Sequence, residues 1–255
     1  MERIGNYNVN LGENGDLGGG SFGSVHKATH ITSGEQVAVK KARRPTGKNV
    51  DPVAAKEFEE KYVMNELEAL NAINHPNIVR FYDSVLTKFF LYIFLEYCIE
   101  GSLSDFVDKV GNLLLKMKVL FMKQMAAGVQ CLHLNHFWHR DLKPENILVQ
   151  VEEHQYIVKL TDFGIAKKVT HASAVGIASS VGTESWMAPE VYPEDGYARY
   201  SSSADIFSLG LVFLSLLEHV AGKSLQALKG KVRCCYRKPH VAINIINKTM
   251  CYVAI

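Results

Sequence analysis

The sequence predicts an α+β fold in which antiparallel strands come first and long helices follow. Segments with alternating apolar residues fill much of the first part of the chain, whereas apolar residues at helical spacing recur at 117–133 and 206–217. A run of strands followed by a run of helices is typical of α+β folds. With 255 residues, the chain is long enough for one large domain or two lobes.

The composition argues against several classes of protein. The 28 Lys and Arg residues nearly balance the 26 Asp and Glu residues, so the bulk charge gives no support to nucleic-acid binding. The five cysteines have no zinc-like spacing and indicate reduced thiols in a reducing, cytoplasmic compartment. The N-terminus lacks the apolar stretch of a signal peptide, and the apolar run 206–217 is too short to span a bilayer.

A glycine-rich turn follows the first strand-like segment. Residues 17–28 read LGGGSFGSVHKA, where Gly18, Gly20 and Gly23 fit the pattern G-x-G-x-x-G. Glycine permits positive φ and lets backbone N–H groups approach phosphate oxygens, although a flexible hairpin tip has the same pattern. The residues after Gly23 are strand-like, whereas a dinucleotide-binding fold needs a helix there. The Walker pattern is also absent.

A lysine ends the next strand-like segment, VAVK at 37–40. An exposed strand lysine is the simplest interpretation, because burying a lone ammonium group is costly and an inward Lys40 needs an anionic partner. The charged segment from Pro52 to Ile73 has apolar residues at helical spacing. It offers Glu66, beside its apolar stripe, as that partner. Two more strands are expected, one after 75–77 and one at 89–97.

The densest set of polar residues lies in HFWHRDLKPENILV at 136–149, between an apolar helix and an apolar strand. Asp141 can accept a proton or orient a hydroxyl, and Lys143 can neutralise a phosphate. Asn146 offers a neutral oxygen to Mg²⁺, and the later TDFG segment adds Asp162 as a charged metal ligand. Each residue alone would be solvated surface, but the set suits phosphoryl transfer, which needs positioning, metal ions and positive charge.

Five ordered motifs, LGGGSFGSV, VAVK, HRDLKPEN, DFG and WMAPE, resemble the eukaryotic protein kinase family. The resemblance runs from about Leu11 to Val220. It implies a bilobal fold: an antiparallel β-sheet N-lobe with one main helix at 1–97, and a mostly α-helical, partial C-lobe at 98–220. ATP would bind between the lobes. Residues 221–255 form an atypical tail without family motifs.

The resemblance implies a serine/threonine protein kinase that transfers the γ-phosphoryl group of ATP, with Mg²⁺, to hydroxyls of protein substrates. An upstream activating kinase is an expected partner, and neither a nucleic acid nor a membrane span is expected. Lys40 would hold the α- and β-phosphates and pair with Glu66. Asp141 would orient or deprotonate the hydroxyl, while Lys143 would meet the γ-phosphate. The metal ligands would be Asn146 and Asp162.

The resemblance also implies the nucleotide contacts. Gly18, Gly20 and Gly23 would cover the phosphates. Backbone groups of Glu96 and Cys98 would meet the adenine edge, beside Leu95 as gatekeeper. The adenine would lie between Val25, Ala38 and Leu148, and a regulatory spine would contain Leu70, Phe81, His139 and Phe163, anchored by Asp205.

Specificity and regulation follow from the same resemblance. Lys143 and Thr183 match the serine/threonine class, and Arg140 before Asp141 indicates regulation through the activation segment. Ser179 or Ser180 is the predicted phosphosite that orders this segment through Arg140. The strings GTESWMAPEV and HPNIVRFYDS look most like kinases of the sterile-type, kinase-cascade group.

Three departures from the family pattern stand out: Gly19 is an extra glycine, Trp138 is bulkier than expected, and no late arginine matches the family's partner of Glu190. The tail at 221–255 resembles a readthrough or alternative-splice end, so a truncated C-lobe is expected. A catalytically weak kinase-like binding module, or truncated isoform, therefore remains the alternative function. A small-molecule phosphotransferase is less favoured, because such enzymes rarely carry the full Ala-Pro-Glu segment.

Overall fold

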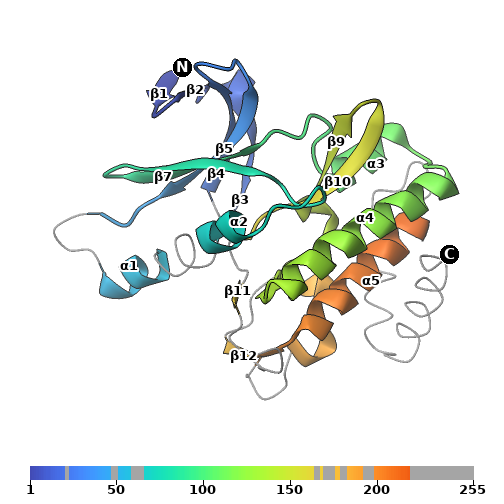
Figure 1. The fold of residues 1–255 in the computed structure, drawn as a ribbon. Helices are drawn as coiled ribbons and strands as arrows, with labels where there is room; N and C mark the ends of the chain where they lie inside the picture. The colour runs from blue at the N-terminus through green and yellow to red at the C-terminus, as the bar shows by residue number, and fades with distance from the viewer. Residues whose placement is uncertain are drawn as a thin grey trace. The chain divides into compact units, whose positions relative to one another are not determined.

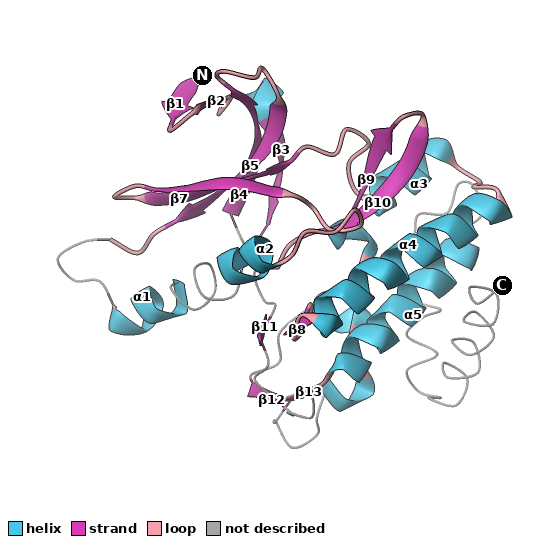
Figure 2. Ribbon diagram, in the orientation of Figure 1, coloured by secondary structure: helices cyan, strands magenta, loops and turns pink. Residues whose placement is uncertain are grey.

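The computed structural model describes residues 1–20, 23–46, 51–58, 66–163, 167–168, 176–178, 183–191 and 198–218. The chain divides into two compact units. The first unit contains Met1–Asn74 and Val79–Cys98, and the second contains His75–Ile78 and the described chain from Ile99 onward. Strands dominate the first unit and helices the second (Figures 1 and 2), which confirms the predicted α+β class. The predicted tail at 221–255 lies outside the described residues.

The first unit is built on an antiparallel sheet. Its described strands follow the order β1-β2-β4-β5-β7-β6, and β3 also pairs with β4. Because side chains alternate between the two faces of a strand, Val37 and Val39 of β5 share one face while Ala38 and Lys40 share the other. The strands are β1 Glu2–Ile4, β2 Tyr7–Val9, β3 Asp16–Gly20, β4 Gly23–His30, β5 Gln36–Arg43, β6 Phe81–Leu86 and β7 Phe90–Glu96.

One face of this sheet carries the core of the first unit. The ring of Tyr7 stacks on Phe94, with 3.8 Å between the ring centroids and 13° between the planes. The short N-terminal hairpin of β1 and β2 thereby packs against the same apolar cluster as β5 and β7. This cluster consists of Ile4, Tyr7, Val9, Ala28, Val37, Val39, Tyr92 and Phe94.

The helical segment expected at 52–73 is described in two pieces, α1 (Pro52–Phe58) and α2 (Glu68–Ala72). Glu66 and Leu67 form a helical turn directly before α2, and residues 59–65 lie outside the described part of the chain. Ala69 and Leu70 are buried, so one face of α2 is apolar and excluded from solvent.

The described part of the second unit contains three α-helices: α3 (Leu103–Val110), α4 (Leu115–Leu134) and α5 (Ser202–Glu218). Helices α4 and α5 lie side by side (Figure 1). They confirm the helices predicted at 117–133 and 206–217. Among the described residues, no helix combines the length and apolar character needed to cross a membrane. The remaining strands are β8 Phe137–Trp138, β9 Ile147–Glu152, β10 Gln155–Leu160, β11 Lys167–Lys168, β12 Gly176–Ala178 and β13 Ala198–Tyr200.

The segment His75–Ile78 belongs to the second unit, where hydrogen bonds join it to β10. The Asn77 side chain donates to the carbonyl of Val158 at 3.0 Å, and the Leu160 N–H donates to the Asn77 carbonyl at 2.9 Å. Gly128 of α4 lies directly beneath this junction. A Cβ at Gly128 would come within 2.8 Å of the Asn77 carbonyl oxygen and 2.9 Å of Leu160 Cδ1.

We expect Gly128→Ala to destabilise the protein by roughly 1–3 kcal/mol, because the added methyl group overpacks this junction. In an open helix the same change would stabilise by about 1 kcal/mol, since alanine is the better helix former. Urea denaturation of the two proteins measures the difference. Gln130→Ala, on the exposed side of α4, is the matched control and should change stability little. A Gly128→Ala protein more stable than the parent would contradict this packing.

Candidate active site

The glycine-rich turn joins β3 to β4 in the first unit. Gly18 and Gly23 have φ values of +112° and +117°, a conformation that side chains disfavour. The Gly18 N–H donates to Asp16 Oδ1 at 2.9 Å, and Gly20 pairs with Gly23. A Cβ at Gly23 would lie 2.2 Å from the carbonyl oxygen of Lys41 on the adjacent strand. Glycine at 23 therefore allows β4 and β5 to pair closely beside the turn.

We expect Gly23→Ala to cost roughly 2–4 kcal/mol, because it combines an unfavourable φ with a backbone clash. Gly34 provides a matched control in the β4–β5 turn. Its φ is also positive, +72°, but a Cβ there would meet no atom within 4 Å. Gly34→Ala should therefore show only the conformational cost, about 1 kcal/mol. Thermal melts of both variants measure the effects, and equal losses would show that the clash is relieved.

Lys40 projects from β5 on the face opposite the apolar cluster. Its Nζ lies 2.6 Å from Glu66 Oε1, and the two side chains are 7% and 1% exposed. Burial of an ammonium group is tolerated here because a carboxylate is in direct contact. The turn before α2 thus brings Glu66 to the strand lysine, within the first unit, and fixes the position of the Lys40 ammonium group.

The residues expected to surround adenine are distributed over both units. Val25, which pairs with Lys40, and Ala38 are half-buried in the first unit, and Leu148 is half-buried in β9 of the second. At the end of β7, the Glu96 N–H donates to the Arg80 carbonyl at 2.9 Å. The Glu96 carboxylate accepts from the Arg80 N–H at 3.2 Å. Glu96 is half-buried, and Leu95 and Cys98 are buried.

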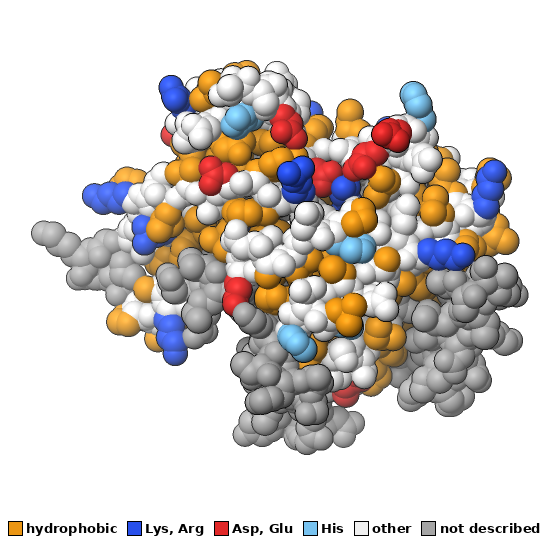
Figure 3. Space-filling model, in the orientation of Figure 1, with side chains coloured by type: hydrophobic (Ala, Val, Ile, Leu, Met, Phe, Trp, Pro, Cys, Tyr) orange, Lys and Arg blue, Asp and Glu red, His pale blue; other side chains and the backbone are white. Residues whose placement is uncertain are grey.

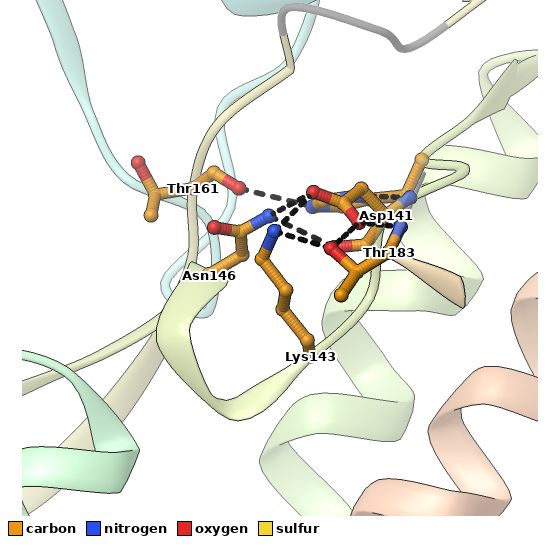
Figure 4. A network of polar contacts seen from close by, with 6 residues as sticks. Asp141, Lys143, Asn146, Thr161 and Thr183 are labelled. Carbon is orange, nitrogen blue, oxygen red and sulfur yellow. Dashed lines mark hydrogen bonds and ion pairs between the residues drawn. The ribbon is translucent and has the colours of Figure 1, made fainter. Parts of the chain in front are cut away.

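Asp141 is the centre of a polar network in the second unit (Figure 4). Its Oδ2 lies 2.6 Å from Lys143 Nζ. Its Oδ1 accepts from both the N–H and the hydroxyl of Thr183, each at 2.8 Å. Lys143 also donates to the Thr183 hydroxyl at 2.7 Å. A 5% exposed carboxylate is thus held in one orientation by three donors from two segments of the chain.

Asn146 completes this network and offers a metal ligand. Its amide nitrogen donates to Asp141 Oδ2 at 3.0 Å and to the Asp141 carbonyl at 2.9 Å. Figure 4 shows the nitrogen directed toward Asp141, so the Asn146 carbonyl oxygen is directed away from it. Hydrogen bonding therefore fixes which end of the amide would face a cation.

Asp162 follows β10 with a φ of +64°, in the left-handed region that is unusual for a non-glycine residue. Its carboxylate and the Asn146 carbonyl are hard oxygen donors that fit Mg²⁺, which needs few protein ligands when phosphates and water supply the rest. No group of three or more His, Cys, Asp or Glu side chains within the described ranges could hold a metal by itself.

Asp205 at the start of α5 supports the loop that carries Asp141. This 2% exposed carboxylate accepts from the backbone N–H groups of His139 and Arg140 at 2.9 Å and 2.8 Å. His133 Nε2 lies 2.8 Å from the same carboxylate. Arg140 has a φ of +67°, a strained conformation that these contacts help to hold.

The His139 ring links the loop to the segment that carries Asp162. Its Nδ1 accepts from the Asp141 N–H at 3.4 Å, so its Nε2 carries the proton and donates to the Thr161 carbonyl at 3.0 Å. The ring also packs on Phe163, with 5.3 Å between the centroids. Two members of the expected spine, His139 and Phe163, are therefore in contact. Leu70 and Phe81 belong to the first unit, where Leu70 is buried and Phe81 half-buried.

Arg140 lies over the ring of Tyr200, with 5.2 Å between its guanidinium carbon and the ring centroid. Burial lowers the pKa of the Arg140 guanidinium, while Tyr200 and Asp205 act in the opposite direction. An arginine remains charged under these conditions, so it is a desolvated cation. The predicted phosphosites Ser179 and Ser180 lie outside the described residues.

Sequence reasoning missed two contacts of this site. Thr183 marked the serine/threonine class, but its hydrogen bonds to Asp141 join residues 42 positions apart. The sequence indicates His133 only as the end of a predicted helix, although in the structure it contacts Asp205, 72 positions away. A histidine at the last turn of the helix before the HRD segment is the signal that could have found the second contact.

Comparison with known proteins identifies the same family along most of the chain. A family model described as the protein kinase domain matches residues 11–243. The serine/threonine-protein kinase ATG1a of Arabidopsis thaliana is 34% identical over 201 residues, which cover 79% of this chain and 30% of that protein. Mitogen-activated protein kinase kinase kinase 3 of the same organism is 36% identical over 211 residues, covering 81% of this chain and 30% of that protein.

The cytokinesis protein sepH of Aspergillus niger is 38% identical over 202 residues, covering 79% of this chain and 14% of that protein. The chain therefore spans less than a third of the length of these curated relatives.

Proposed function

Because the chain belongs to the protein kinase family, we propose that it is a serine/threonine protein kinase that transfers the γ-phosphoryl group of ATP to hydroxyls of protein substrates. The observation that carries the proposal is the buried Asp141 carboxylate, oriented by Lys143, Asn146 and Thr183. The relatives named as serine/threonine or mitogen-activated kinases support it.

Lys40 is the proposed phosphate-binding cation of the first unit. Its contact with Glu66 holds the ammonium in one place, so that phosphate binding does not have to immobilise a flexible side chain. Gly18, Gly20 and Gly23 carry no side chains that would keep phosphate oxygens away from the backbone of this turn. Val25, Ala38 and Leu148 are the proposed apolar contacts of adenine, and backbone groups of Glu96 and Cys98 its polar ones.

Asp141 is the proposed residue that orients the substrate hydroxyl and accepts its proton. A hydroxyl that donates to this carboxylate would be aligned for attack on the γ-phosphorus. Lys143, 2.6 Å from Asp141, is the proposed residue that would neutralise charge developing on the transferred phosphoryl oxygens. Asn146 and Asp162 would hold magnesium, which when bound supplies positive charge to the phosphates.

The contact between Lys143 and Thr183 supports the serine/threonine preference. Thr183 connects the segment before WMAPE to both Lys143 and Asp141. The activation segment and the catalytic loop are thereby in direct contact at the point where the acceptor hydroxyl would arrive. Regulation by an upstream kinase acting on this segment is part of the same proposal.

Transfer of labelled γ-phosphate from ATP to a generic basic protein tests the proposed function. We expect Mg²⁺-dependent labelling that phosphoamino-acid analysis assigns to serine and threonine, and no labelling by Asp162→Asn. Labelling of tyrosine alone would overturn the specificity. If parent protein that is soluble and melts cooperatively gave no labelling, the kinase proposal would fail and a binding module would be favoured.

A further inference from the structure

The end of the sheet in the first unit carries a cluster of cations that the proposed phosphotransfer does not use. The cluster consists of four basic residues, at the end of β5 and in the β6–β7 turn, with two exposed apolar residues between them. In Figure 3 basic side chains lie at the outer edge of the described surface, next to the end of the hairpin that contains β7. We call Lys41, Arg43, Arg44, Leu86, Lys88 and Phe89 the basic–aromatic patch.

Strand pairing brings the members of the patch together. Arg43 pairs with Phe90, and Lys41 pairs with Tyr92, across β5 and β7. The Arg44 N–H donates to the Phe89 carbonyl at 2.8 Å, and its guanidinium donates to the Thr87 carbonyl at 2.9 Å. Hydrogen bonds therefore hold the basic end of β5 against the β6–β7 turn.

Two of the cations, Lys41 and Lys88, make cation–π contacts with aromatic rings. Lys41 Nζ lies 4.2 Å from the centroid of the Phe90 ring, and Lys88 Nζ lies 5.3 Å from that of Phe89. Leu86 and Phe89 remain 56% and 53% exposed. The patch thus combines positively charged side chains in fixed positions with solvent-exposed apolar surface.

No carboxylate neutralises this charge within the described residues. The sequence has no Asp or Glu between Glu35 and Asp51, and none between Asp83 and Glu96. None of the four cations takes part in an ion pair of the described chain. Burial, and to a smaller extent the charge of Glu2, raises the pKa of the Tyr92 hydroxyl, but Glu2 forms no ion pair with any of the four cations.

We propose that the basic–aromatic patch is a docking surface for an acidic peptide segment of a partner protein, one that carries an aromatic or aliphatic side chain. Carboxylates of the segment would meet Arg43, Arg44 and Lys88, and its apolar side chain would cover Phe89 and Leu86. A peptide fits better than a nucleic acid, because the net charge of +2 provides no extended positive field and the cations are confined to one end of a sheet.

Fluorescence anisotropy of a short Glu-rich peptide with one central Phe tests the proposal on the full chain. We expect saturable binding that weakens as salt is added and is lost when the glutamates are replaced by glutamines. Arg43→Glu with Lys88→Glu should weaken binding at least about thirtyfold, because both replacements repel the peptide. Phe89→Ser should weaken it about tenfold while leaving the salt dependence unchanged.

The matched control is Lys116→Glu with Lys123→Glu, which changes the net charge equally on exposed positions of α4. It should alter binding by less than about twofold, since charges distant from a contact are screened. Equal loss in both double variants, with unchanged melting temperatures, would overturn the proposal in favour of a general charge effect. Tighter, patch-dependent binding of a single-stranded oligonucleotide would overturn it in favour of a nucleic-acid site.

Discussion

Lys40→Met should reduce phosphate transfer by roughly a thousandfold or more, because it removes the cation that we propose binds the nucleotide phosphates. It should also lower stability by roughly 3 kcal/mol, since Glu66 remains buried after its partner at 2.6 Å is removed. Initial rates of transfer from labelled ATP, and urea denaturation of the same preparations, measure the two effects.

A second variant separates the loss of chemistry from the loss of folding. Lys40→Met combined with Glu66→Met removes both charges, so it should regain much of the lost stability. It should still transfer no phosphate. Lys123→Met, an exposed position on α4, is the control and should match the parent in both measurements. Activity that returned together with stability in the double variant would show that Lys40 acts only as a structural residue.

Asp141→Asn should reduce the transfer rate by about a thousandfold with little change in the KM for ATP, because the substrate hydroxyl loses the proton acceptor that we propose for it. The replacement also turns an amide nitrogen toward Lys143, Asn146 or Thr183, each of which donates to Asp141 in the parent. Rates measured over a range of ATP concentrations separate the two kinetic constants.

Glu153→Gln, in the exposed β9–β10 turn, removes one negative charge elsewhere in the second unit and is the matched control. Its kinetic constants should equal those of the parent. If Asp141→Asn retained most of the parent rate while melting at the parent temperature, Asp141 could not be the residue that accepts the proton.

The sequence predicted those parts of the fold that depend on local patterns. Helices α4 and α5 were found because their apolar residues recur at helical spacing, and β5 because its residues alternate. The N-terminal hairpin was not predicted. Strands of three residues carry almost no local signal, and β2 is defined by its pairing with β4 and by the stacking of Tyr7 on Phe94.

Contacts between distant segments could not be predicted for a different reason. The donors to Asp141 from Thr183, and the three donors to Asp205, depend on how loops and helix ends meet in three dimensions. Likewise, Asn77 follows the helical segment of the first unit in sequence, but its side chain donates a hydrogen bond to β10 of the second unit. Motif order predicts the proposed chemistry, whereas packing determines which side chains hold its residues in place.

We propose that this chain transfers phosphate through Asp141 and Lys40. The most direct test measures the rate of γ-phosphate transfer from Mg-ATP to a protein substrate for the full 255-residue chain, beside Asp141→Asn at an equal folded fraction. We predict serine and threonine labelling by the parent and a rate about a thousandfold lower for the variant. Equal rates for the two proteins, or a folded parent that transfers no phosphate, would contradict the account.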